Sequence, residues 1–294
     1  MKIAVCIHLY HTNMWEEITH YLKNLKVDYD LYVNLPIKDS QFGNNLPADF
    51  IWSEYTSLNP DLIPNGVKTE PLAIRHYLKH GIKEKRKYTN NILIEDRIKK
   101  FKPNAKIIFS PNKGVDIGGF LYTYKHVDPK TDLVLKIHTK AGLGSTQTPS
   151  KSVLNRGVSA AQRSGNNWFK ILMNGVLESE VKVNNILNEF KNNPECGMVG
   201  NKIVSCFNPN MGEISKIYKM MNLKKFSPEF KFVGGTIFWV RNDIIKRYLT
   251  PNNIDRILST LPDGYVNEPS PNHAMERIFG CLVYKEKQKL IVVD

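Results

Sequence analysis

The 294-residue sequence has no long apolar run and no C-x-x-C pair, and its first residues predict no targeting segment. A membrane-spanning helix needs about 18 or more consecutive apolar residues. No stretch reaches that length, so we expect no transmembrane segment. Residues 1–7 are too short for a signal peptide and lack a small-residue cleavage site, which predicts a cytoplasmic protein. The four cysteines lie far apart, and their spacing fits neither a disulfide framework nor a zinc knuckle: Cys6, Cys196, Cys206 and Cys281.

Acidic residues are few relative to basic ones. The chain contains 41 lysines and arginines against 28 aspartates and glutamates, which gives a net charge of +13. Such a surface attracts anions in general, including nucleic acid, lipid head groups and sugar nucleotides. The basic residues are spread along the chain, and no RNA-binding or helix-turn-helix signature accompanies them. The charge therefore supports phosphate affinity and not specific nucleic-acid recognition. Peripheral membrane contact and the oligomeric state stay open.

The spacing of apolar residues predicts an α/β protein in which strands and helices alternate. The chain opens with a strand at 2–8, a helix at 15–25 and a short strand at 30–34 that ends before Pro36, a βαβ unit of a parallel sheet. Further strands are predicted at 106–109, 131–137, 197–200 and 231–241, the last with a Gly-Gly kink, and further helices at 91–101, 114–126, 166–177, 182–192, 242–249 and 272–280.

Residues 45–88 break this alternation. The pattern predicts two short helices, at 50–62 and 70–81, joined by a loop that contains Pro and Gly, with Gly81 as a C-terminal stop. The segment resembles a short helical module that recurs beside polysaccharide-making glycosyltransferases. We interpret residues 45–88 as a helical insertion in the main domain.

The predicted strand at 131–137 runs directly into the motif Lys-x-His-Thr-Lys, residues 136–140. Ligands of open α/β sheets bind in the crevice at the carboxyl ends of the strands. Lys136, His138 and Lys140 alternate along the extended chain, so all three can point to one face and form a cationic site for a phosphate or diphosphate. The alternative is that both lysines are ordinary surface residues. Residues 143–152 have the composition of a mobile loop over this crevice.

Asp116 lies in a glycine-rich stretch where a helix is predicted to begin. Gly114, Gly118 and Gly119 permit close approach of a ligand to the backbone, and the N-terminus of the helix favours an anion. Asp116 would then accept a hydrogen bond from a base or a ribose hydroxyl. The alternative is that its carboxylate only caps the helix.

Four segments, in this order, resemble the rhamnan-synthesis F family of polysaccharide-building proteins. The resemblance extends over most of the chain except 45–88. It implies a transferase that moves rhamnose or a related deoxysugar from a dTDP- or UDP-sugar to a glycan acceptor, in polysaccharide or glycoprotein-glycan synthesis. The segments are 112–120, 135–140, 232–241 and 272–280, and residues 7–10 and 15–17 also fit.

The same segments fit the nucleotide-sugar-binding GT-A arrangement, a Rossmann-like, mostly parallel sheet flanked by helices. The resemblance implies one GT-A-like domain over residues 1–294. A core strand of that arrangement ends in Asp-x-Asp, which holds a divalent metal on the diphosphate. Lys-x-His-Thr-Lys stands in its place here, so we expect fixed cationic donors and no metal. The implied nucleotide contacts are His8, Tyr10, Asn112, Gly114 and Asp116, and the implied diphosphate contacts are Lys136, His138, Lys140, Arg241 and Arg277.

Glu276 is the candidate general base of such a transfer. A helix places His273, Glu276 and Arg277 near one face, and either cation can keep the carboxylate ionised. The alternative is a structural Glu–Arg pair against the sheet. Asp263 and Glu268, in the preceding polar loop, are reserve candidates.

The expected reaction is inverting rather than retaining, although one sequence does not determine stereochemistry. Two other functions stay open. One is a non-catalytic protein of the same fold that binds a glycan or a nucleotide sugar. The other is a basic nucleic-acid-binding protein, for which the sequence shows neither a stacking platform nor a basic stripe.

Overall fold

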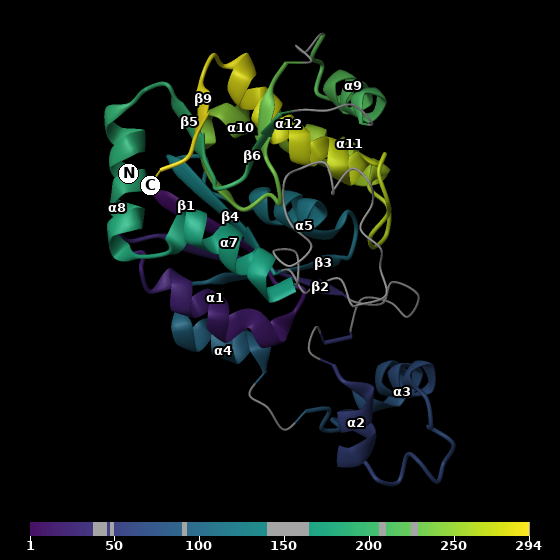
Figure 1. The fold of residues 1–294 in the computed structure, drawn as a ribbon. Helices are drawn as coiled ribbons and strands as arrows, with labels where there is room; N and C mark the ends of the chain where they lie inside the picture. Colours follow the sequence, from purple (N-terminus) through teal and green to yellow (C-terminus); the bar gives the residue numbers. More distant parts are fainter. Residues whose placement is uncertain are drawn as a thin grey trace.

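A computed structural model describes residues 1–37, 46–47, 50–89, 93–139, 165–205, 210–224 and 229–293. Its centre is a seven-stranded sheet with the order β3-β2-β1-β4-β8-β5-β9 (Figure 1). Only β8 runs antiparallel to its neighbours. The strands are β1 (Ile3–His8), β2 (Asp30–Ile37), β3 (Lys106–Pro111), β4 (Leu133–His138), β5 (Cys196–Val199), β8 (Phe238–Arg241) and β9 (Lys289–Ile291). The predicted α/β fold with a mostly parallel sheet is confirmed.

Helices cover both faces of this sheet, as Figure 1 shows. Every residue of β1 and β4 is buried, because a parallel strand between two helical layers has no solvent-facing side. One layer contains α1 (Trp15–Leu22), α4 (Ile94–Phe101), α7 (Gly165–Leu177) and α8 (Glu180–Asn192). The other contains α5 (Val115–Tyr124), α9 (Met211–Met220), α10 (Asn242–Tyr248), α11 (Pro251–Thr260) and α12 (Pro271–Lys285).

Residues of the predicted insertion form a hydrophobic cluster of their own, which includes Tyr55, Leu62, Ile74 and Tyr77. It is built by α2 (Trp52–Leu58), α3 (Glu70–His76) and the π-helical turn Tyr77–Gly81. Figure 1 shows these elements away from the main sheet. The interpretation of 45–88 as an insertion stays a prediction.

The predicted end of the second strand before Pro36 is wrong, because β2 continues to Ile37. Leu9 N donates to Asn34 O at 2.9 Å, so Asn34 faces β1. Pro36, two residues on, faces the same side, where β1 has already ended. Its missing N–H therefore breaks no ladder hydrogen bond, while β2 stays paired with β3 on its other side.

The predicted single strand at 231–241 is also wrong. Its first part, β7 (Lys231–Val233), pairs with β6 (Ile203–Ser205) in a separate two-stranded sheet. Its second part, β8, joins the main sheet antiparallel to β4. The turn at Gly234–Gly235–Thr236 divides the two, because Gly235 (φ +84°) and Thr236 (φ +53°) both take left-handed backbone conformations. The structure also contains β6, β9, α9, α11 and a short 3₁₀ helix (Thr12–Met14), which the sequence analysis did not identify.

Candidate functional site

Three polar side chains lie in register at the carboxyl ends of neighbouring parallel strands. His8 at the end of β1 stands opposite His138 of β4 on one side and Asn34 of β2 on the other. Lys136 precedes His138 by two residues and therefore lies on the same face of the sheet. This is the edge at which α/β proteins bind ligands, and α5 packs against β1 and β2 here.

Asp116, in the first turn of α5, faces this row of side chains. Its Oδ2 atom lies 2.7 Å from Lys136 Nζ, 2.5 Å from Thr236 Oγ1 and 3.8 Å from His138 Nε2. Burial alone would raise the pKa of Asp116, but His138, Lys136 and the Thr236 hydroxyl outweigh it and hold that pKa well below its ordinary value. Asp116 is therefore ionised at neutral pH. Its other oxygen, Oδ1, bonds no group within the described part of the chain, and the side chain is 20% exposed.

The Gly235–Thr236 turn is the point on which these groups converge. Lys136 Nζ donates to Thr236 O at 3.0 Å and to Thr236 Oγ1 at 2.9 Å. His138 Nε2 lies 2.7 Å from Gly235 O. Gly235 N in turn donates to Glu276 Oε1 at 2.7 Å. Side chains from β4, α5 and α12 thus hold a turn whose second residue is β-branched and left-handed.

A second left-handed pair immediately precedes Asp116. Gly114 has φ +63° and Val115 has φ +48°. A β-branched residue at positive φ is rare and costs of order 1–3 kcal/mol, and such strain is concentrated at functional sites. Val115 and Thr236 are both in this class, and both adjoin the Asp116 carboxylate.

Lys136 is only 1% exposed and has three acceptors within 3.0 Å, one for each ammonium hydrogen. Its charge balances Asp116 and holds the turn. Direct contact between this ammonium and a diphosphate would require one of these three bonds to break. Lys140, the last residue of the motif, and the predicted loop at 143–152 lie outside the described residues.

The glycines before and within α5 are packed against protein. A Cβ atom on Gly114 would lie 2.4 Å from Leu261 Cδ1, and one on Gly118 would lie 1.7 Å from the Lys113 carbonyl oxygen. A Cβ atom on Gly119 would lie 2.0 Å from His8 Nδ1. The close approach that these glycines permit is therefore to neighbouring segments of the same chain.

Thr139 connects the end of β4 to the segment after β1. Its hydroxyl accepts hydrogen bonds from Tyr10 N at 3.0 Å and His11 N at 3.1 Å. The predicted nucleotide contact Tyr10 is thereby held next to His8, and the two rings stack with their centroids 6.4 Å apart.

The three predicted residues of α12 lie together. Arg277 Nη2 donates to Glu268 Oε1 at 2.8 Å, and its Nη1 contacts Glu276 Oε2 at 3.4 Å. His273 Nδ1 lies 2.7 Å from the hydroxyl of Ser270, which caps the helix. Glu276 therefore joins the turn at 235–236 to the pair formed by Glu268 and Arg277, and all of these groups are largely buried.

Arg241 is not part of this cluster. Because β8 is antiparallel to β4, Arg241 stands opposite Leu133 at the amino end of β4. Its guanidinium donates to the carbonyl oxygens of Phe190, in the last turn of α8, and of Asn193 and Cys196, just after it, at 2.5–3.1 Å.

Two other predicted residues lie at the loop that precedes α12. Asp263 is exposed and bridges to Lys113 through the backbone. Asn112 accepts a hydrogen bond from Gly264 N at 2.9 Å through its carbonyl oxygen. The loop before α12 thus packs beside residues 112–113, which lie just before α5.

Sequence reasoning did not single out Thr236, Gly235, Asn34 or Thr139. Thr236 and Gly235 were in a recognised segment, and Thr139 was in the strand-end motif. Nothing in the local pattern around Asn34 indicated a site. Only the pairing of Asn34 with His8 in the sheet shows that this side chain lies at the site.

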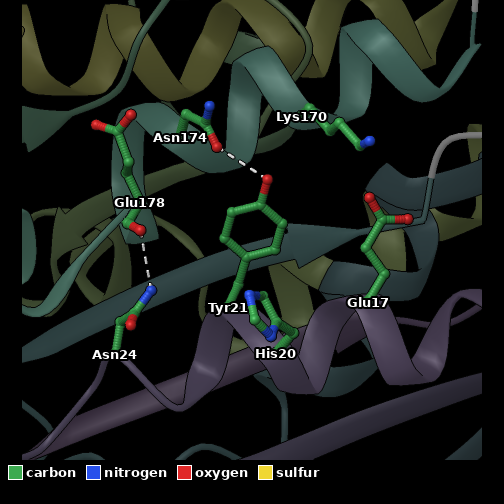
Figure 2. Close-up of a pocket in the computed structure, with 7 residues that line it drawn as sticks. All are labelled: Glu17, His20, Tyr21, Asn24, Lys170, Asn174 and Glu178. Carbon is green, nitrogen blue, oxygen red and sulfur yellow. Dashed lines mark hydrogen bonds between the residues drawn. The ribbon is translucent and has the colours of Figure 1, made fainter.

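A separate open pocket of about 440 Å³ lies between α1 and α7. Figure 2 shows Tyr21 at its centre, where the phenol hydroxyl donates to Asn174 Oδ1 at 2.8 Å. These helices cover the sheet face opposite α5, and none of the predicted site residues lines this pocket.

Within the described ranges, no group of three or more His, Cys, Asp or Glu side chains is arranged to hold a metal ion. Asp116 Oδ2, which already accepts bonds from Lys136 and Thr236, is a poor fit for one. None of the described helices is long and apolar enough to cross a membrane.

The fold and this cluster define an α/β protein with a polar site at the carboxyl ends of its parallel strands. The model of the family described as rhamnan synthesis protein F matches residues 82–288, and the chain belongs to this family. No curated protein and no solved structure matches the chain. Membership implies a role in rhamnan polysaccharide synthesis, with a glycan among the partners.

Proposed function

We propose that this protein is a GT-A-like glycosyltransferase that moves rhamnose or a related deoxysugar from a dTDP- or UDP-sugar to a glycan acceptor. The observation that carries the proposal is that three segments converge on the Gly235–Thr236 turn of a fourth, across sequence separations of up to 160 positions. Asp116, Lys136 and Glu276 each come from a different one of these segments. Three charged groups placed around one strained turn are typical of a reaction centre rather than of a core.

The two carboxylates suit different tasks. The low pKa of Asp116 makes it a poor proton acceptor near neutral pH, so we assign it to accept hydrogen bonds from the donor nucleotide. Glu276 is anchored through Oε1 by Gly235 N, and among the described residues its Oε2 has only the long contact with Arg277. We assign Glu276 to take the proton from the acceptor hydroxyl in an inverting displacement. His273 and Arg277 would hold it in place.

The leaving diphosphate must be stabilised as its bond to the sugar breaks. We propose that His138, Arg277 and Lys140 contribute the positive charge without a divalent metal, while Lys136 holds Asp116 and the turn. The proposed location is the cytoplasm, which cell fractionation can check.

The proposal is tested by thermal shift with dTDP, UDP, GDP and CDP and their sugars, with Mn²⁺ or with EDTA. Saturation at 100 times Kd stabilises the folded state by about 2.7 kcal/mol. We expect stabilisation by the dTDP or UDP series that EDTA does not change. Stabilisation only with Mn²⁺ would exclude the metal-free mechanism, and no shift with any nucleotide would contradict the proposed function.

Turnover then separates an enzyme from a binding protein. Replacement of a general base lowers the rate by about 10²–10⁴. We expect Glu276→Gln to lose transfer to this degree and to keep its affinity for the nucleotide. Glu268→Gln, which removes the other carboxylate bound to Arg277, tests whether the loss is specific to Glu276. Binding without turnover in the unmodified protein would favour a non-catalytic nucleotide-sugar-binding protein.

A further inference from the structure

The orientation of the Asn34 side chain determines which nitrogen of His8 carries the hydrogen. Asn34 Nδ2 donates to Ile108 O at 3.1 Å and to Ser110 Oγ at 2.9 Å. A carbonyl oxygen only accepts, so the amide nitrogen must face Ile108 and the amide oxygen must face His8. His8 Nδ1 lies 2.8 Å from that oxygen. Since the oxygen is an acceptor, Nδ1 must be the donor.

The second nitrogen of His8 is then a bare hydrogen-bond acceptor. Burial lowers the pKa of His8 to about 4, so the ring is neutral at pH 7 and its one hydrogen is on Nδ1. Among the described residues, none bonds Nε2. The ring is locked in place, because Gly119 leaves no room for it to shift toward α5.

The surroundings of His8 place this acceptor at the candidate site. Asp116 of α5, Lys136 of β4 and His11 of the following loop are the charged or titratable groups that act on it. Tyr10 stacks beside it. His8 Cα is also in register with His138 Cα at the carboxyl end of the adjacent strand.

We propose that His8 Nε2 determines specificity by accepting a hydrogen bond from an N–H or O–H group of the bound nucleotide, with Asn34 and Ser110 as positioning residues. The inference rests on the proposed function. The donor group is either the imide N–H of a base such as thymine or uracil, or the 3′-hydroxyl of the ribose or deoxyribose. Cytosine has no hydrogen on the corresponding ring nitrogen, so the two sources can be separated.

The first test is the affinity of the full-length protein for dTDP, UDP and CDP, measured by calorimetry for the unmodified chain and for His8→Phe. Phe keeps a planar aromatic ring, somewhat larger than imidazole, and removes both nitrogens. A lost hydrogen bond to a buried partner corresponds to about 10- to 100-fold in Kd. His20→Phe, on α1 at the opposite face, is the matched control and should leave every Kd unchanged.

Each outcome has a distinct meaning. A preference for dTDP and UDP over CDP that disappears in His8→Phe identifies the base N–H as the donor. Equal weakening of all three nucleotides in His8→Phe identifies a hydroxyl. Unchanged affinities in His8→Phe would overturn the inference and leave the proposed function intact. Failure of the unmodified protein to bind any nucleotide would overturn both.

A second measurement does not depend on the folding of a variant. ¹⁵N NMR of the histidine-labelled protein shows directly which ring nitrogen carries hydrogen. We expect Nε2 of His8 to be unprotonated at pH 7 and its resonance to shift when nucleotide is added. A protonated Nε2 in the free protein would overturn the inference.

Discussion

Two lysine–aspartate pairs in this protein have the same length and different surroundings. Lys136 and Asp116 are 2.7 Å apart with the lysine 1% exposed, whereas Lys125 and Asp255 are 2.7 Å apart with the lysine 32% exposed. An exposed pair gains little, because water screens both charges. Removal of one partner of a buried pair leaves a charge without compensation, which costs several kcal/mol. Burial and not distance therefore distinguishes the two pairs.

We predict that Lys136→Met lowers the free energy of unfolding by about 3 kcal/mol, because Asp116 and the Thr236 carbonyl both lose their cation. Lys125→Met, the matched control, should change it by less than about 1 kcal/mol. Urea unfolding followed by circular dichroism measures both. Equal effects would show that Lys136 is not a buried structural cation.

The low pKa of His8 predicts a pH dependence of stability. Below its ordinary pKa of about 6.5, the unfolded chain takes up a proton that the folded protein does not bind until about pH 4. Stability should therefore fall as the pH is lowered through this window, by up to about 3 kcal/mol. We expect His8→Gln to lack this part of the pH dependence in unfolding curves at pH 4–7. Parallel curves for the two proteins would contradict the buried neutral state.

At the scale of elements, the direction of β8 decides what its last residue does. The guanidinium of Arg241 lies at the amino end of β4, with the last carbonyl groups of α8 within reach. A cation suits this position, because the C-terminus of a helix carries partial negative charge. The ring of Phe190 packs against it as well. Arg241 thus joins α8 to the sheet.

We predict that Arg241→Met destabilises the protein by about 2 kcal/mol, since three carbonyl groups lose a charged donor. Nucleotide affinity should be unchanged, because the residue lies at the opposite end of β4 from His138. Arg247→Met, which removes a half-exposed cation paired with Glu286, is the control and should cost less than about 1 kcal/mol. Weaker nucleotide binding by Arg241→Met would show that this arginine contacts the ligand.

At the scale of the whole molecule, the family match covers a shorter part of the chain than the fold does. The match begins at residue 82, yet β1 and β2 lie before it and form two of the inner strands of the sheet. β1 also supplies His8 to the site. Residues 1–37 are therefore integral to the fold, whereas α2 and α3 pack into a cluster of their own.

We predict that residues 46–88 can be replaced by a short Gly-Ser linker without loss of the main fold. The replaced residues contribute to a separate hydrophobic cluster, so the core around the sheet keeps its contacts. The shortened protein should unfold in one cooperative transition, and on the proposed function its Kd for nucleotide should equal that of the full chain. Aggregation or loss of cooperativity would show that the segment is part of the main domain.

Local sequence patterns were sufficient to predict most of the parallel strands on one side of the sheet. Alternating or continuous apolar runs predicted β1, β3 and β4, and helical spacing predicted α1, α7 and α8 within a few residues. The short β6 and β9 have only three residues each, too few to show a period. The run at 231–241 was misread because its composition is that of one strand, and only a left-handed turn divides it.

The sequence by itself determined the buried strand that ends in Lys136 and His138 and the helix that begins beside Asp116, since apolar spacing and glycine positions are local, and it predicted a polar site there. Only the tertiary structure decided how each is used. Lys136 became a buried support because Thr236, 100 positions away, supplies two of its acceptors. Arg241 lies at the amino end of β4, away from the site, because β8 runs antiparallel. Pairing partners and strand direction depend on packing between distant segments, and no local pattern encodes them.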